Sequence, residues 1–228
     1  MFVLEKVIQL FAPHDCLGCG SEGCLLCEVC QRTCISDAPN ECFRCGAVTT
    51  GSAACEVCLK SLPLTSIHSR TGFTEIARDL VHALKFDRAQ AAAATIGTLL
   101  AQIVPANLSN CIVVHVPTAN SRRRQRGYDH AELIAKELAR VLDCKYLPLI
   151  VRHGSSRQVG ASRSARLAQL HNSFEVLPTR LSRQSAILLV DDVITTGASI
   201  CSAAQTLRVA GFQAIHAVTF AQTTTTHH

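Results

Sequence analysis

The segment 187–199, with the sequence ILLVDDVITTGAS, constrains the fold of this chain more than any other part of it. Four apolar residues, which are typical of a buried strand, are followed at once by two carboxylates, Asp191 and Asp192. Charged residues that come directly after a buried strand emerge at its carboxyl end, where parallel α/β sheets bind their ligands. The segment therefore predicts a strand, a loop and a helix of such a sheet, with a binding site at the loop.

The loop after the two aspartates has the residues of a phosphate site. Amides at the start of a helix, together with the positive end of its dipole, suit a dianionic phosphate. Gly197 lets the backbone close round the anion, and Thr195, Thr196 and Ser199 can donate hydroxyl hydrogen bonds to it. An ordinary capped turn would need only one of these hydroxyls, and no GxxxxGK[ST] loop occurs in the chain. The aspartates can accept hydrogen bonds from sugar hydroxyls or help to hold Mg²⁺.

The N-terminal part of the chain is dominated by cysteine. Ten of the 13 cysteines lie between residues 16 and 58, and eight of these form four CxxC pairs. Two thiolate pairs with this spacing complete a tetrahedral four-cysteine zinc site. The alternatives are a disulfide scaffold, which needs an oxidising compartment, and a redox or iron–sulfur site. The predicted zinc ligands are Cys16, Cys19, Cys27, Cys30, Cys42, Cys45, Cys55 and Cys58.

The order of the four pairs leaves two arrangements open. In the simpler one, the first two pairs hold one zinc ion and the last two hold another, and in the second arrangement the pairs interleave. In either case the metal serves structure, because four thiolates leave no open position for water or substrate. The segment also has too few large apolar residues to fold without metal. Cys24 and Cys34 are interpreted as surplus thiols.

After Pro63, apolar strand patterns alternate with helical ones. Helices are expected at 74–86, 89–104, 128–142 and 198–211, and strands at 111–117, 144–151, 186–190 and 212–221. Such alternation predicts an α/β fold with a mainly parallel sheet that is covered by helices on both faces. The expected division is an N-terminal helix with a double zinc ribbon at 1–62, followed by the α/β domain at 63–228.

Charge is distributed unevenly between these parts. Residues 1–59 carry 3 basic and 7 acidic residues, whereas residues 121–183 carry 13 basic and 5 acidic ones. The later part therefore favours a polyanionic ligand, although a solvated basic surface would have the same composition. No run reaches the roughly 18 apolar residues of a membrane span, and Glu5 and Lys6 interrupt the apolar start in a way that a secretory leader does not. We expect a cytoplasmic protein without membrane insertion.

The segment 187–199 resembles the phosphoribosyl pyrophosphate (PRPP) signature of type I phosphoribosyltransferases. The strand, the paired acids and the TTGAS loop match that signature position by position. The resemblance implies that Asp191 and Asp192 are catalytic residues that contact the ribose hydroxyls of PRPP, with Mg²⁺ as a cofactor. It implies that the 5-phosphate binds to the loop formed by Thr195, Thr196, Gly197, Ala198 and Ser199.

A narrower resemblance covers nearly the whole chain. The cysteine pairs, the strings LVHALKF and VHVPTANSRRRQRGYDHAELIAKELA, and the PRPP signature are similar to those of the ComF/GntX family. Asp129 and His130 stand where the family pattern has Asn and Gln. The resemblance implies a type I phosphoribosyltransferase-like domain behind a zinc-ribbon module. It also implies a role in natural competence, the uptake of single-stranded DNA into the cytoplasm, with a helicase-like translocase as a partner.

The segment after strand 111–117 supplies the remaining candidate residues. In the phosphoribosyltransferase layout, Thr118, Ala119 and Arg122 belong to the part that binds the pyrophosphate. Arginine pairs with phosphate oxygens through two parallel hydrogen bonds, and an aromatic ring beside it can stack on a base of single-stranded DNA. The predicted nucleic-acid residues are Arg122, Arg123, Arg124, Arg126, Tyr128 and Arg166.

Two functional hypotheses follow from the residues and the resemblance. In the first, the protein is a Mg²⁺-dependent phosphoribosyltransferase of nucleobase or nucleotide salvage, in which catalysis is mainly electrostatic. In the second, it keeps the phosphoribosyltransferase fold to bind PRPP or another phosphoribosyl group and handles single-stranded DNA. The excess of basic residues and the second resemblance favour the DNA-handling hypothesis, and the question of turnover stays open.

Overall fold

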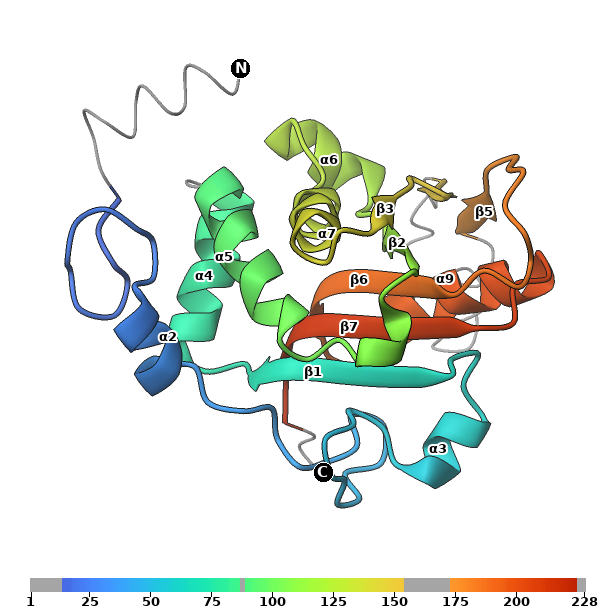
Figure 1. Cartoon of the computed structure of the whole chain (residues 1–228), viewed down its shortest axis with the longest axis horizontal. Helices are drawn as coiled ribbons and strands as arrows, with labels where there is room; N and C mark the ends of the chain where they lie inside the picture. The colour runs from blue at the N-terminus through green and yellow to red at the C-terminus, as the bar shows by residue number, and fades with distance from the viewer. Residues whose placement is uncertain (1–13, 87–88, 154–172, 225–228) are drawn as a thin grey trace, which may run out of the picture.

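The centre of the molecule is a parallel five-stranded sheet. In the computed structural model, which describes residues 14–86, 89–153 and 173–224, the strand order is β1-β7-β6-β2-β3, and all neighbouring strands are parallel. Figure 1 shows the three long strands side by side. The strands are β1 (Ser66–Gly72), β2 (Ile112–His115), β3 (Lys145–Tyr146), β6 (Ile187–Ile194) and β7 (Ile215–Gln222).

Helices cover both faces of this sheet. Residues alternate between the two faces of a strand, so Leu188 and Val190 belong to one hydrophobic core and Ile187 and Leu189 to the other. The first core is closed by α4 (Glu75–Phe86), α5 (Ala89–Ala101) and α7 (His130–Val141), which lie together in Figure 1. The second is closed by α9 (Ala198–Val209). The predicted fold class, a parallel sheet flanked by helices, is confirmed.

Two predicted strands end at other residues in the structure. The prediction for 144–151 was wrong, because the chain forms β3 in the main sheet and then β4 (Ile150–Arg152) in a separate antiparallel pair with β5 (Phe174–Val176). Pro148 has no N–H to donate and lies at this break. Strand β6 runs on to Ile194 instead of ending at residue 190, so that both aspartates lie inside it.

Short helices complete the described part of the chain. They are α2 (Glu28–Cys34) and α3 (Glu56–Lys60) in the cysteine-rich segment, a 3-10 turn at Ala106–Leu108, and α6 (Asn120–Arg126) after β2. No helix in the described ranges is both long and apolar enough to cross a membrane. The helix predicted at the start of the chain lies outside the described residues.

The cysteine-rich segment packs against the sheet domain in two places. Leu25 and Leu26 join the core that contains α4, whereas Phe43 and Ala53 join the core that contains α9. Figure 1 shows α2 beside α4, and α3 next to the edge strand β1. The first and second halves of the segment therefore pack on opposite faces of the sheet. The division into domains at residue 62 stays a prediction.

Candidate ligand site and cysteine clusters

The eight cysteines of the CxxC pairs form two clusters. Cys16, Cys19, Cys27 and Cys30 form cluster 1, and Cys42, Cys45, Cys55 and Cys58 form cluster 2, with the sulfur atoms of each cluster within 4.8 Å of one another. The consecutive arrangement of the pairs is therefore the one in the structure, and the interleaved one is not.

The spacing of the sulfur atoms fits zinc. A tetrahedral site with Zn–S bonds of about 2.3 Å has sulfur atoms about 3.8 Å apart. The Sγ atoms of Cys19 and Cys27 are 3.8 Å apart, and those of Cys45 and Cys55 are 3.7 Å apart. The four-thiol donor sets and these separations match a structural zinc ion in each cluster.

Backbone amides point at the sulfur atoms in both clusters. The Cys27 amide donates to Cys16 Sγ at 3.3 Å, and Gly20 and Gly46 take positive φ angles of 74° and 70° at the two turns. Burial raises the pKa of the Cys16 thiol, but hydrogen bonds from the amides of Cys27, Cys19 and Gly18 outweigh it and lower this pKa to about 6. The same balance lowers the pKa of Cys42 to about 6. Both thiols are thus ready to lose the proton that metal binding displaces.

The predicted phosphate loop surrounds a small hollow. Thr195, Thr196, Gly197, Ala198 and Ser199 line it together with Asp191 and Thr219. Gly197 is the N-terminal flanking residue of α9, with φ +70°, and no side chain caps this helix. The structure therefore brings the loop and one of the two acids together at the end of β6, as the sequence predicts.

The loop contacts Phe43, a residue next to cluster 2 in the sequence. A β-carbon added to Gly197 would lie 2.3 Å from Cε2 and 2.9 Å from Cζ of Phe43, which follows the cluster 2 ligand Cys42 in sequence. Glycine is thus required here by the positive φ and by the aromatic ring. Sequence reasoning assigned no role to Phe43.

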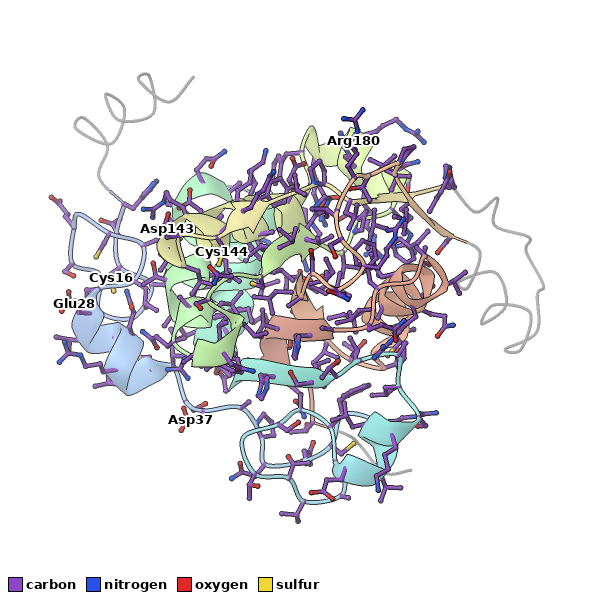
Figure 2. The ribbon with its side chains drawn as sticks, turned by 45° about the vertical axis from the view of Figure 1, so that its right-hand side comes forward. Cys16, Glu28, Asp37, Asp143, Cys144 and Arg180 are labelled. Carbon is purple, nitrogen blue, oxygen red and sulfur yellow. The ribbon has the colours of Figure 1, made fainter. Side chains whose placement is uncertain are left out.

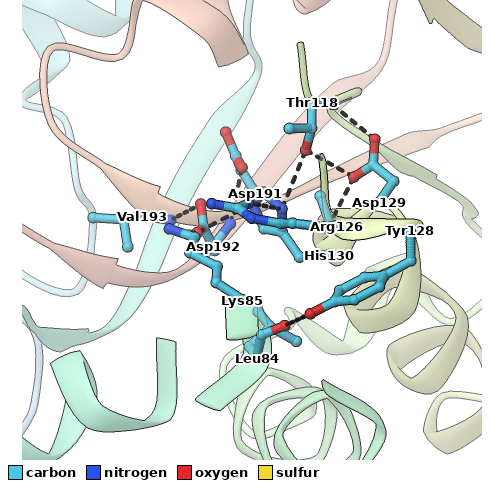
Figure 3. Close-up of polar contacts among 11 residues, drawn as sticks. Leu84, Lys85, Thr118, Arg126, Tyr128, Asp129, His130, Asp191, Asp192 and Val193 are labelled. Atoms are coloured by element: carbon cyan, nitrogen blue, oxygen red, sulfur yellow. Dashed lines mark hydrogen bonds and ion pairs between the residues drawn. The ribbon is translucent and has the colours of Figure 1, made fainter. Parts of the chain in front are cut away.

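The two aspartates of β6 have different environments. Asp192 is buried, and its carboxylate forms an ion pair with Lys85 and lies 3.3 Å from His130 Nε2 (Figure 3). Its other oxygen accepts a hydrogen bond from the Val193 amide at 2.8 Å. Burial raises the pKa of Asp192, but His130 and Lys85 outweigh it and hold this pKa well below the usual range.

Asp191 faces the hollow instead. One of its oxygens accepts a hydrogen bond from the Asp192 amide at 2.9 Å, and the side chain lines the same hollow as residues 195–199. Burial and the neighbouring negative charge of Asp192 raise the pKa of Asp191 well above its usual value. Asp192 is thus a fixed, paired carboxylate, and Asp191 is the acid that a ligand in the hollow would meet.

His130 connects Asp192 to the segment after β2. Its Nδ1 atom lies 3.2 Å from Arg126 and 3.2 Å from the hydroxyl of Thr118. A neutral ring with its proton on Nε2 would donate to Asp192 and accept from Arg126. Asp129 caps α7 through the Ala131 amide and accepts hydrogen bonds from both the amide and the hydroxyl of Thr118, at 2.8 and 2.9 Å. The predicted pyrophosphate segment is therefore anchored beside the paired acids.

Four of the predicted arginines lie on the short helix α6. Arg122, Arg123 and Arg124 are exposed on α6, which starts after Ala119, whereas Arg126 is half-buried with its guanidinium 5.2 Å from the ring centre of Phe86. The hydroxyl of Tyr128 donates to the Leu84 carbonyl at 2.9 Å, which fixes the ring beside α4. Arg166 lies outside the described residues.

Sequence reasoning missed two further cations at the site. Lys85, in the last turn of the predicted helix 74–86, carried no signal of its own, because its partner Asp192 lies far along the chain. Arg152 at the end of β4 is the second. Burial lowers its pKa, and Arg122 lowers it further while Asp191 raises it, so these three groups lie close enough to interact. No pattern in the sequence indicates that Arg152 interacts with Asp191.

A domain model and several known proteins match this chain. Residues 129–227 match the phosphoribosyl transferase domain, so the fold and the acid-and-hydroxyl site define a protein with a phosphoribosyltransferase-type domain. The DNA utilization protein YhgH of Salmonella typhimurium is 31% identical over 193 residues, covering 80% of this chain and 83% of that protein. YhgH of Escherichia coli K12 is 29% identical over 201 residues, covering 83% of this chain and 87% of that protein.

Two further proteins match only part of this chain. Competence protein F of Haemophilus influenzae is 33% identical over 106 residues, covering 45% of this chain and 46% of that protein. A structure of glutamine PRPP amidotransferase from B. subtilis, complexed with ADP and GMP, aligns over 57% of this chain and 26% of its own, with 19% identity and a TM-score of 0.41. The chain belongs to the ComF family, the family of YhgH and competence protein F.

Proposed function

We propose that this chain binds PRPP or another 5-phosphoribosyl ligand, binds single-stranded DNA, and acts in natural competence in the handling of incoming DNA. One observation carries the ligand part of the proposal. The hollow at the end of β6 combines a free acid, Asp191, with the hydroxyls and amides of residues 195–199 at a helix start. An acid for the ribose hydroxyls and a cradle of donors for the phosphate are what a 5-phosphoribosyl group needs.

The DNA part rests on the exposed arginines of α6. Three consecutive arginines of α6 are exposed to solvent, and Arg126 lies beside His130. A cluster of cations of this kind neutralises phosphates of a strand without reading its sequence. The names of the relatives, DNA utilization protein and competence protein, support the same assignment. A helicase-like translocase would then be a partner in carrying the strand.

Mg²⁺ fits this site when the ligand supplies most of its oxygens. His130, Asp191 and Asp192 place their ligand atoms within 4.8 Å of one another. However, Asp192 is already paired with Lys85, and Mg²⁺ prefers an octahedral set of oxygens. Asp191 is therefore the protein carboxylate available to a Mg²⁺ that arrives with a pyrophosphate.

Titration calorimetry with PRPP and Mg²⁺ tests the ligand assignment. In Asp191→Asn we expect affinity to fall about tenfold or more, which corresponds to about 1.4 kcal/mol. Asp143→Asn is the matched control, because Asp143 is exposed at the end of α7 and changes from acid to amide in the same way. Equal affinity of Asp191→Asn and the wild type would remove Asp191 from the site.

Fluorescence anisotropy with a labelled single-stranded oligonucleotide tests the DNA assignment. We expect binding by the wild type to weaken with salt, and Arg123→Ala/Arg124→Ala to reduce the slope of log K against log[salt] by about 1.4. The control is Arg32→Ala/Arg140→Ala, which removes two exposed arginines away from α6. DNA binding without salt dependence, or an unchanged slope in the α6 variant, would contradict the assignment.

Phosphoribosyl transfer is the second candidate function. It is favoured by the pair of acids with separated pKa values, one fixed by Lys85 and His130 and one facing the hollow. The test is the release of pyrophosphate when the protein is incubated with PRPP, Mg²⁺ and each nucleobase in turn. Release that requires both a base and Asp191 supports an enzyme. PRPP binding without release for any base leaves the DNA-handling function alone.

A further inference from the structure

We propose that Phe43 is a positioning residue for the phosphate loop 195–199, so that cluster 2 is a structural part of the ligand site. The ligand named in this inference rests on the proposed function. The contact itself does not, because it is present in the protein without ligand. Cluster 1 has no corresponding residue among the described contacts of the loop.

The ring of Phe43 is held in place by the cysteine-rich segment to which it belongs. The residue follows Cys42 and precedes Cys45, and both of these are ligands of cluster 2. Its amide donates to the carbonyl of Ala53 at 2.9 Å, and the side chain is 4% exposed. A ring attached at a metal-binding turn, and buried there, has little freedom to move away from what it touches.

Only one residue of the loop is buried. Thr195 and Thr196 are exposed, Ala198 and Ser199 are half-buried, and Gly197 is the one buried residue of the five. The ring of Phe43 lies against Gly197, so closely that a β-carbon there would be 2.3 Å from Cε2. The ring therefore supports the loop at its centre without lining the hollow.

Support of this kind matters for an anion site. Several amides and hydroxyls must converge on one phosphate, and a loop that is already ordered does not lose conformational entropy when the ligand binds. Removing the ring would leave a void beneath Gly197 and let the loop sample other conformations. The ligand would then have to order the loop, and its affinity would fall.

The contrast between the two clusters supplies a matched control. Leu25 is 2% exposed and belongs to the core on the opposite face of the sheet, together with α4. Phe43→Ala and Leu25→Ala both remove a large buried side chain from the cysteine-rich segment, and both lower stability. Only the first removes the support of the loop.

Hydrogen exchange of the protein without ligand is the deciding measurement. We expect the amides of residues 195–200 to exchange faster in Phe43→Ala than in Leu25→Ala, with an intermediate rate in Phe43→Leu, which restores part of the volume. Exchange in that segment that is equal in Phe43→Ala and Leu25→Ala would overturn the inference. If Phe43→Ala does not fold, Phe43→Leu against Leu25→Ala gives the same comparison.

Affinity for PRPP and Mg²⁺, measured by calorimetry, is the second readout. We expect a loss of about tenfold in Phe43→Ala and little change in Leu25→Ala. Faster exchange of the loop with unchanged affinity would overturn the functional part of the inference. If the wild type binds no PRPP, the proposed ligand is wrong, and the exchange measurement still decides whether Phe43 positions the loop.

Discussion

Asp191 and Asp192 are neighbours in β6, but their carboxyl groups point to opposite surroundings. Lys85 and His130 pair with Asp192, and among the described residues Asp191 forms no such ion pair to offset its burial beside that charge. At the scale of single residues, this difference separates two tasks. Asp192 fixes α4 and α7 to the end of the strand, and Asp191 stays available to a ligand.

The raised pKa of Asp191 predicts a gain of stability in Asp191→Asn. The folded state binds a proton at Asp191 more tightly than the unfolded chain does. Stability from this group is therefore present below the unfolded pKa of about 4 and is lost as pH rises toward the higher folded pKa. We expect Asp191→Asn to melt at a higher temperature than the wild type at pH 7 without Mg²⁺, with a smaller difference at pH 4. A difference that does not depend on pH would contradict this reasoning.

Gly197→Ala is expected to destabilise the protein more than an equivalent change elsewhere. Gly197 and Gly51 have similar angles, φ +70° and +67°, so alanine meets comparable backbone strain at both. Only at Gly197 does the new β-carbon overlap Phe43, since nothing lies within 4 Å at Gly51. Denaturant unfolding of both variants should show an additional loss of about 1–3 kcal/mol for Gly197→Ala. Equal losses would mean that the ring moves aside freely.

At the scale of elements, local pattern determined most of the sheet domain. The helices around α4, α5, α7 and α9 were predicted because each repeats apolar residues with helical period, and β2, β6 and β7 because their apolar runs are short and flanked by breaks. Strand β1 was not predicted, because Ile67 is the one large apolar residue in Ser66–Gly72 and the strand depends on β7 for pairing. The sequence predicted that β6 ends just before Asp191 and Asp192. In the structure the strand continues to Ile194, where it still pairs with β7.

The site was predictable only where its residues are adjacent in sequence. The loop 195–199 and Asp191 could be identified from one string, since the chemistry and the spacing lie together. Lys85, Arg152 and Phe43 come from three distant segments, and their roles arise from sheet order and packing. Local sequence carries no record of such contacts.

The two cysteine clusters predict a defined metal content. Elemental analysis of protein kept reduced should find about two zinc ions per chain. Cys45→Ser should lower this to about one, because it removes a ligand of cluster 2 alone. Cys24→Ser is the control and should keep both ions, since Cys24 belongs to neither cluster. Loss of metal in the control, or two ions in Cys45→Ser, would refute the assignment of ligands.

At the scale of the whole molecule, the acidic N-terminal segment and the arginine-rich part lie apart. Figure 2 shows Glu28 and Asp37 on the cysteine-rich segment and Arg180 at a distance from them. The same segment contributes buried residues to both cores, through Leu25 and Leu26 on one face and Phe43 on the other. It therefore packs on both faces of the sheet, although its net charge is opposite to that of the arginine-rich part.

Because the cysteine-rich segment shares both cores with the sheet, we expect the metal-binding segment and the sheet to unfold together. Calorimetric melting should show one cooperative transition, and removal of zinc with a strong chelator should lower its midpoint by roughly 10 °C or more. An independent ribbon domain would give a separate transition that disappears alone. Melting of the sheet at an unchanged temperature after metal removal would show that the two parts are independent.

The position of β7 in the sheet has a consequence for how the protein is made. β7 lies between β1 and β6, so it joins the edge strand next to the cysteine-rich segment to the strand that carries the aspartates. During synthesis, every other strand of the described residues leaves the ribosome before β7 does. Until residue 222 has emerged, β1 and β6 both have an open edge, exposed to other nascent chains. A delay in translation before β7 has emerged therefore prolongs the exposure of the open edges of β1 and β6 and favours aggregation.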